Sequence, residues 1–189
     1  MRFLIGLLVI SLAAVAYAQI PTPCYSPRLF EARMIEDDFN KNFTMRAKLS
    51  YDGDNQRIRI VEEVNIKDKR DFYDTLFIDN RDFQVEYALN LRTKKCEKRP
   101  LTRRFRPVQI PSNATFYGEL YLGDSLLTQS WGGKTPQGGL YHLLWTVHDC
   151  LPVTETYYST RTSFVHTTFF DVTLGISDPN VFIPPRECL

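Results

Sequence analysis

Long runs of alternating apolar and polar residues constrain the fold of this chain more than any other feature. From Phe43 to Tyr51 every odd position is apolar and every even position is polar. Successive side chains of a β-strand point to opposite faces of a sheet, so this run predicts a strand with one dry and one wet face. Because an amphipathic helix needs apolar residues at every third or fourth position, the pattern favours an all-β fold.

The turns between such runs predict two β-hairpins and a series of further strands. Polar residues 52–55 separate the first run from an alternating return, so residues 43–66 are expected to form one hairpin. A second polar turn at 79–82 separates 73–78 from 83–91 in the same way. The remaining predicted strands, rich in Thr, Val, Tyr and Phe, are 115–122, 126–131, 140–147, 153–158 and 163–174.

These strands predict one all-β domain, an antiparallel sandwich or half-barrel of about nine or ten strands. Helical signal is limited to one turn, which begins at Ser177 to Pro179 and reaches Phe182. Each strand carries large apolar side chains on one face, and aromatic residues make up 13% of the chain. That face must be buried against a second sheet or around a cavity, and the pattern leaves both arrangements open.

The first eighteen residues have the features of a secretion signal. Arg2 precedes an almost wholly apolar run at 3–15, and Ala16 and Ala18 are small residues of the kind that a signal peptidase reads. The run ends before Gln19, so it is shorter than the roughly twenty apolar residues that cross a membrane. We therefore predict a signal peptide at 1–18, a single domain at 19–189, secretion to the extracellular space and no transmembrane segment.

The charges of the chain are balanced. It contains 23 Lys and Arg against 22 Asp and Glu, and loss of Arg2 with the signal peptide leaves equal numbers. No net field draws such a protein to nucleic acid, so we predict no nucleic-acid partner. Basic residues concentrate between 94 and 106, which fits contact with anionic headgroups or extracellular polyanions, or a solvated sheet edge protected by charge.

Four cysteines fit two disulfides, because a secreted protein reaches an oxidising compartment. Cys24, Cys96, Cys150 and Cys188 contain no C-x-x-C pair, and the three histidines are not spaced as zinc-finger ligands. Four cysteines allow three pairings, and the local sequence does not choose among them. Every pairing closes at least one long loop, so the bridges join distant parts of one domain.

Two glycosylation sequons agree with secretion. They are Asn42-Phe43-Thr44 and Asn113-Ala114-Thr115, and neither has proline at its middle position. Asn113 follows a proline-containing segment that is predicted to be a loop, which favours its exposure. We predict glycans at Asn42 and Asn113.

No constellation of residues in the sequence points to an enzyme. The chain has no G-x-S-x-G elbow, no H-E-x-x-H pair and no glycine-rich phosphate loop followed by a helix. His142, His148 and His166 do not form a triad pattern, so we predict no catalytic residues. The turn at 52–55 begins like an EF-hand loop, but Arg57 stands where that loop needs glycine, and no metal ligands are assigned.

Several separate segments resemble the ependymin-related protein family. The first runs from Leu49 to Ile60 and reads LSYDGDNQRIRI. The others, in chain order, are 93–96, 110–116, 147–153 and 169–182. Because the segments occur in the family's order with the cysteines in register, the resemblance extends along most of the chain after residue 18.

The resemblance implies a fold, a function and a disulfide pairing. The fold would be two stacked antiparallel sheets that form a half-barrel around an apolar pocket, similar to the bacterial lipoprotein carriers. Members of the family bind fatty acids, phospholipids or other hydrophobic molecules, and the resemblance also implies calcium binding and a homodimer. By matching motifs it implies the bridges Cys24–Cys150 and Cys96–Cys188.

We therefore expect a secreted glycoprotein that binds a fatty acid or other lipid, with roughly 0.8 kcal/mol gained per buried methylene. The alternative is an extracellular matrix or cell-adhesion protein that acts through its surface charges and glycans. Side chains that share one strand face are the candidate pocket walls, and ordinary core packing is the alternative for each of them. They are Val85, Tyr87 and Leu89; Leu120 and Leu122; and Leu143, Trp145 and Val147.

Overall fold

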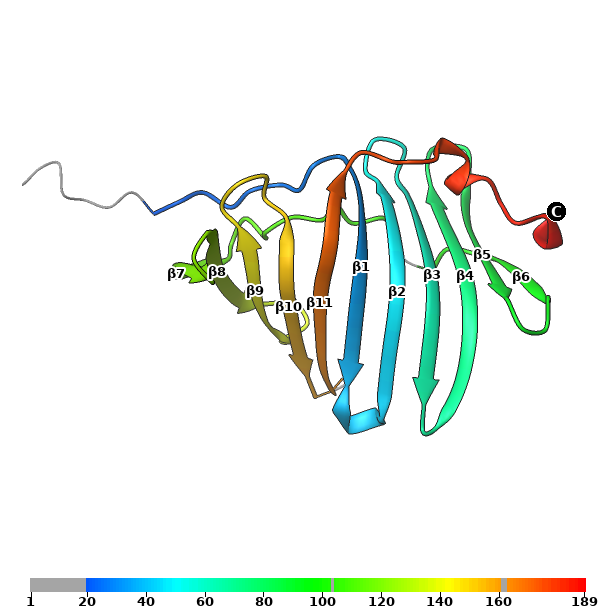
Figure 1. Ribbon diagram of the computed structural model, residues 1–189, viewed down its shortest axis with the longest axis horizontal. Helices are drawn as coiled ribbons and strands as arrows, with labels where there is room; N and C mark the ends of the chain where they lie inside the picture. Colours follow the sequence, from blue (N-terminus) through cyan, green and yellow to red (C-terminus); the bar gives the residue numbers. More distant parts are fainter. Residues whose placement is uncertain (1–19, 103, 161–162) are drawn as a thin grey trace, which may run out of the picture.

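The computed structural model describes residues 20–102, 104–160 and 163–189, so the predicted signal peptide at 1–18 lies outside the described residues. Within them, eleven strands form one antiparallel sheet in the order β6-β5-β4-β3-β2-β1-β11-β10-β9-β8-β7 (Figure 1). The strands are β1 (Leu29–Asp38), β2 (Phe43–Asp52), β3 (Arg57–Ile66), β4 (Lys69–Asp79), β5 (Gln84–Asn90), β6 (Cys96–Pro100), β7 (Thr115–Leu122), β8 (Leu126–Lys134), β9 (Leu140–Thr146), β10 (Pro152–Ser159) and β11 (Ser163–Leu174).

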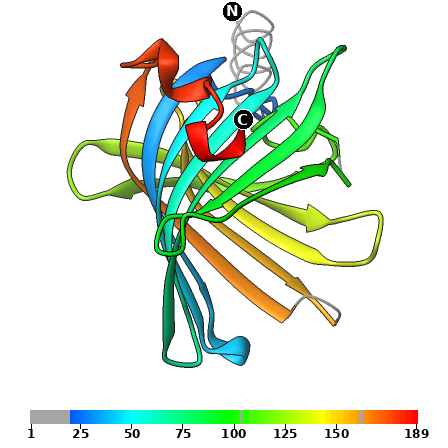
Figure 2. The same cartoon turned by 90° about the vertical axis from the view of Figure 1, so that its right-hand side faces the viewer.

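The all-β half-barrel that the sequence predicts is confirmed, and its two layers are halves of one continuous sheet. β1 joins the halves because it pairs with both β2 and β11, with Phe30 opposite Tyr51 and Met34 opposite Phe169. The long strands twist, so the sheet curves strongly without closing (Figure 2). Its two edges are therefore β6 and β7.

Both predicted hairpins are present, with nearly the predicted turns. β2 and β3 pair along their whole length, from Phe43 opposite Ile66 to Asp52 opposite Arg57. β4 and β5 form the second hairpin, in which Tyr73 lies opposite Asn90. The strands expected at 115–122 and 163–174 have those bounds as β7 and β11.

Two strands, β1 and β6, lie where the sequence reading placed none. β1 ends in Glu36, Asp37 and Asp38, and this acidic cluster conceals an alternation that begins at Phe30. Asp38 is buried there because it accepts a hydrogen bond from the Asn40 backbone N–H and pairs with Lys41 in the short 3-10 helix η1 (Phe39–Lys41). Composition alone would place an acidic residue such as Asp38 in a solvated loop. Its contacts with η1 stabilise the buried carboxylate instead.

The inner face of the curved sheet carries the largest apolar cluster. Phe30 and Met34 on β1 point to this face, as do Tyr51 and Leu49 on β2, of which Tyr51 lies opposite Phe30. Alternation along each strand brings these side chains to one side, since partners opposite each other in a ladder share a face. The other side of the sheet is the outer face.

The chain between β6 and β7 must cross the whole inner face, because these strands are the two edges of the sheet (Figure 1). Its residues 104–114 form a segment that we call the connector. Phe105 stacks on Tyr51 with ring centroids 5.6 Å apart, and the Val108 backbone N–H donates to the Tyr51 hydroxyl at 3.2 Å. Ile110 packs into a second inner cluster. The connector therefore covers part of the face that a second sheet covers in a sandwich.

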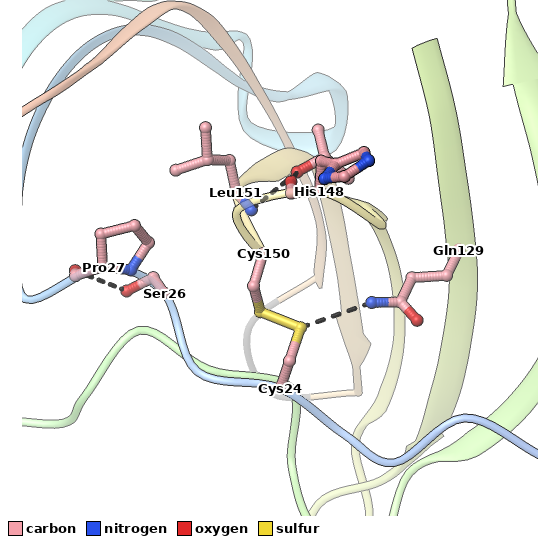
Figure 3. Close-up of a disulfide and its surroundings, with 8 residues drawn as sticks. Cys24, Ser26, Pro27, Gln129, His148, Cys150 and Leu151 are labelled. Atoms are coloured by element: carbon pink, nitrogen blue, oxygen red, sulfur yellow. Dashed lines mark hydrogen bonds between the residues drawn. A yellow bond between two sulfur atoms is a disulfide. The ribbon is translucent and has the colours of Figure 1, made fainter.

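The N-terminal segment 20–28 is anchored to the connector and to the opposite half of the sheet. The Ile110 backbone N–H donates to the Cys24 carbonyl at 3.0 Å. Cys24 is bonded to Cys150, and the Gln129 side-chain amide approaches its sulfur at 3.4 Å (Figure 3). Because 126 residues separate the two cysteines, this bridge ties the start of the chain to the turn between β9 and β10.

The outer face carries its own core under the C-terminal segment. Leu76, Val85 and Tyr87 pack there against Phe182 of η2 (Pro179–Phe182). The helical turn that the sequence predicts at this position is confirmed, with Asp178 as its N-cap. A further turn, η3 (Arg186–Cys188), ends at the second bridge, Cys96–Cys188. Both bridges are those that the family resemblance implies.

Buried charges of the outer face are paired. Arg59 donates from Nε to Asp74 Oδ1 at 2.7 Å and from Nη1 to the Val181 carbonyl at 2.6 Å. The Arg57 guanidinium lies 4.4 Å from the ring centroid of Phe182. These contacts fasten the C-terminal segment to β3 and β4.

Candidate functional site

A cavity of about 710 Å³ lies between the inner face and the connector. Strands from both halves of the sheet contribute to its wall, and the loop between β8 and β9 closes one side. The cavity exists because the connector does not pack against the inner face along the whole of its path between the two edges of the sheet. At about 710 Å³, this space is larger than a second cavity of about 490 Å³ beside Tyr73 and Thr93.

Much of the cavity wall is apolar. Phe30, Met34 and Leu49 come from β1 and β2, while Leu143 and Phe169 come from β9 and β11. Met34 lies directly opposite Phe169 in the ladder that joins the two halves of the sheet. The halves therefore meet at a continuous apolar surface, suited to contact with an alkyl chain or a ring system.

Two carboxyl groups interrupt this apolar wall. Glu155 lies in the middle of β10, opposite Leu143 on β9 and Thr167 on β11. Burial, and secondarily the negative charge of Glu36, raises the pKa of Glu155 to about 7. The Thr167 hydroxyl donates to Glu36 Oε2 at 3.2 Å, so the hydrogen of that hydroxyl is directed to β1. The cavity thus contains a carboxyl group that titrates near neutral pH.

Two cationic side chains also line the cavity. Arg106 belongs to the connector and Lys134 to the end of β8, and both are exposed to solvent. Of the other described basic residues between 94 and 106, Arg99 pairs with Glu86 and Arg104 pairs with Asp79. These two charges of the basic stretch are therefore neutralised locally.

Comparison with known proteins assigns the chain to a family. The sequence model of the Ependymin family matches residues 67–188. A relative from Mus musculus, "Mammalian ependymin-related protein 1", is 38% identical over 176 residues, which cover 89% of this chain and 77% of the relative. The chain belongs to the ependymin family. "Ependymin-2" of Carassius auratus is 30% identical over 94% of this chain and 85% of its own length.

The fold of this ependymin-family chain also occurs far outside close relatives. The crystal structure of an uncharacterized conserved protein from Thermus thermophilus superposes with a TM-score of 0.56. The match covers 95% of this chain and 96% of that chain at only 9% sequence identity. Such a likeness extends to the fold alone, and it supports the curved antiparallel sheet as the common architecture.

One of the candidate pocket residues, Leu143, lines the main cavity. Val85, Tyr87 and Leu89 on β5 point to the outer face, where they are buried by packed side chains. The reason is register, since Glu86 and Ala88 take the inner positions next to Phe77 and Thr75 of β4. Alternation shows that three residues share a face, but it does not show which face is hollow.

The other four candidates lie outside the cavity wall. Leu120 and Leu122 are exposed on the edge strand β7, and Val147 is exposed after β9. Trp145 is fully buried in a packed cluster with Trp131 and Ile110 rather than facing open space. The sequence reading missed Met34 and Glu36 because β1 was not recognised as a strand, although the alternation from Phe30 was available as a signal.

Both sequon asparagines are exposed. Asn42 follows η1, where it adopts a left-handed conformation with φ of 48°. Asn113 lies at the end of the connector and contributes to the cavity rim. Both positions satisfy the accessibility that a glycan requires, and a glycan on Asn113 would stand beside the cavity.

No group of three or more His, Cys, Asp or Glu side chains suited to a metal ion occurs among residues 20–102, 104–160 and 163–189. The carboxylate of Asp52 in the turn that begins like an EF-hand accepts instead from the Asn55 backbone N–H at 2.9 Å and from Arg57 Nε at 3.1 Å. These residues do not fit a calcium site, and we derive no role for the ion.

A serine and a histidine approach each other outside the cavity. Ser130 Oγ lies 2.9 Å from Nε2 of His142, and neither residue lines the cavity. His142 stacks on Tyr117 instead, with ring centroids 6.1 Å apart.

In the described part of the chain, no helix is long and apolar enough to cross a membrane.

Proposed function

We propose that this member of the ependymin family is a secreted, glycosylated protein that binds a lipid or another hydrophobic molecule under the connector. The observation that supports the proposal is the cavity of about 710 Å³. Small-molecule sites typically measure about 300–1,000 Å³, with mostly apolar walls and a few polar groups that set orientation. Its wall of Phe30, Met34, Leu49, Leu143 and Phe169 has this character.

The gain from binding is the removal of an apolar chain from water. Each buried methylene contributes roughly 0.8 kcal/mol, so a chain of eight or more carbons offsets the cost of association. Because the wall is already formed by paired strands, little ordering of the protein is needed on binding. The connector covers the chain from the solvent side through Pro107, Val108 and Pro111.

The covalent features of the chain support an extracellular site of action. Two long-range disulfides connect the termini to the sheet, and such bridges persist in oxidising compartments. Two exposed sequons and the predicted signal peptide at 1–18 agree with this destination. We assign the protein no covalent chemistry, and the close pair of Ser130 and His142 lies outside the cavity wall.

Fluorescent-probe binding with a cavity-filling variant tests the proposal. The neutral probe N-phenyl-1-naphthylamine should bind the secreted wild-type protein, and Leu143→Trp should weaken binding because the larger side chain narrows the cavity. The matched control is Leu120→Trp on β7, where the native side chain is 51% exposed and lies outside the cavity. Organic extraction of the natively secreted protein followed by mass spectrometry should recover a lipid.

Absence of probe binding together with an empty extract would overturn the proposal. Binding to collagen or a polyanion that fades with salt and survives in Leu143→Trp would then favour the matrix or adhesion alternative. The homodimer that the family resemblance implies stays a prediction, which the molecular mass in solution measures.

A further inference from the structure

Glu155 is a half-buried carboxyl group in the largely apolar wall of the cavity. Its cross-strand partner Leu143 and its near neighbour Phe169 belong to the apolar wall. A carboxylate in such a setting has lost part of its water, which is costly unless the cavity supplies a hydrogen-bond donor or the group is protonated.

The protein itself supplies no such donor within the part of the chain that the structure describes. The Thr167 hydroxyl, on the adjacent strand, donates to Glu36 instead. The Tyr157 hydroxyl lies against Gly139, and the Tyr141 hydroxyl lies against Gly133 and has no hydrogen-bond partner. No hydrogen bond or ion pair reaches the Glu155 carboxyl from residues 20–102, 104–160 or 163–189, which leaves it available to a bound molecule.

We propose that the ligand is a cationic amphiphile, an alkyl chain that carries an aliphatic amine, and that its ammonium group pairs with the Glu155 carboxylate. This inference rests on the proposed function, because it assigns the polar end of the same ligand. The alkyl chain lies on the apolar wall, and the ammonium group donates charge-assisted hydrogen bonds to a carboxylate that otherwise has none.

The other charges of the cavity favour a cation at this point. Glu36 on β1 is two strands from Glu155, about 10 Å across the sheet, and carries the same sign. An anionic headgroup near Glu155 would meet both. The cations Arg106 and Lys134 are exposed, so water and salt screen their attraction for an anion. The titratable groups that face the cavity with Glu155 are Glu36, Arg106, Lys134, Tyr141 and Tyr157.

Displacement of N-phenyl-1-naphthylamine by three ligands of equal chain length tests the inference. Dodecylamine, dodecanol and dodecanoic acid are compared below their aggregation thresholds, with the secreted wild type, with Glu155→Gln and with the control Glu119→Gln on the distant strand β7. At pH 8 the amine should displace the probe at concentrations about ten-fold lower than the other two, the gain expected of a hydrogen bond to a charged group.

Glu155→Gln should remove the advantage of the amine, so that dodecylamine displaces the probe no better than dodecanol does, and Glu119→Gln should keep the wild-type ranking. Lowering the pH to 5.5 should reduce the advantage as well, since an alkylammonium stays charged there while Glu155 becomes protonated. If dodecanoic acid matches or exceeds the amine, or if the ranking survives in Glu155→Gln, the inference is wrong although the proposed function stands. If the probe does not bind at all, the proposed function itself fails.

Discussion

The two faces of this sheet treat buried charge in opposite ways. On the outer face, Arg59 is held by Asp74 and by a carbonyl of the C-terminal segment. On the inner face, Glu155 is surrounded by the cavity wall and receives no hydrogen bond from the described residues. The sheet thus carries a packed core on the outer face of β3 to β5, and on the inner face of β10 it carries a carboxyl group without a hydrogen-bond partner among the described residues.

The presence or absence of a partner indicates whether a buried charge contributes to stability or to ligand binding. A buried ion pair whose partners satisfy each other stabilises one arrangement of the chain, and losing either partner is costly. A buried carboxyl group without a partner destabilises the empty protein and becomes satisfied only by a proton or a ligand. The outer core is therefore expected to respond to mutation in stability, and the inner cavity in binding and in pH dependence.

Removing the disulfides one at a time gives the largest expected effect on this comparison. The Cys24→Ser/Cys150→Ser and Cys96→Ser/Cys188→Ser variants should each lose about 4 kcal/mol of unfolding free energy, because the bridges close loops over 126 and 92 residues. Only the first pair anchors the segment that pairs with the connector, so only that variant should also bind the neutral probe more weakly. Urea denaturation and probe titration measure the two effects, and equal probe affinities would contradict the distinction.

Breaking the outer ion pair should have the next largest effect. Asp74→Ala leaves the guanidinium of Arg59, whose side chain is 16% exposed, without its carboxylate and should lower the unfolding free energy by about 3 kcal/mol. Asp74→Asn keeps the volume and one acceptor, so its loss should be smaller. Probe affinity of the folded variants should stay at the wild-type value. A loss below about 1 kcal/mol in urea denaturation would show that the pair is solvated.

Glu155→Gln should stabilise the ligand-free protein at neutral and alkaline pH. Because folding raises the pKa of Glu155 from its ordinary value of 4.5 to about 7, the folded state retains a proton that the unfolded state loses. The unfolding free energy of the wild type should therefore fall between about pH 4.5 and pH 7, and the variant should lack this decline. At pH 8 the variant should be more stable by about 3 kcal/mol, and at pH 4 the two should agree. Urea midpoints across this range measure the difference.

The smallest effect is expected at the edge of the sheet. Arg99 pairs with Glu86 across β5 and β6, and its side chain is 55% exposed. Arg99→Ala should change the unfolding free energy by at most about 0.5 kcal/mol, since solvent screens such pairs. Thermal denaturation in low and high salt measures it. A loss as large as that of Asp74→Ala would remove the contrast between exposed and buried pairs.

Much of the fold was predictable because it depends on local alternation and turns. The β2–β3 hairpin could be recognised because odd positions from Phe43 to Tyr51 are apolar and a polar turn follows. β1 was missed because Glu36 to Asp38 break the apolar pattern, while Asp38 is in fact buried through its contacts with η1. Capping of this kind depends on the three-dimensional path and leaves little trace in composition.

Much less of the candidate site was predictable. Leu143 could be named as a wall residue, but Val85 and Tyr87 obey the same alternation and face the packed outer core. Glu155 could not be identified as a site residue from the sequence, because it is one acidic residue in a threonine- and tyrosine-rich strand. Its position became meaningful only when the ladders placed it opposite Leu143 and Thr167, under the connector.

The sequence by itself determined the strands, their dry and wet sides and, through the family resemblance, the pairing of the cysteines. These properties are local, or they repeat a known pattern, so they can be read residue by residue. Only the tertiary structure decided which side of the sheet is hollow. That choice depends on β6 and β7 being opposite edges of one sheet, because the chain between them must then cross the inner face and enclose a cavity.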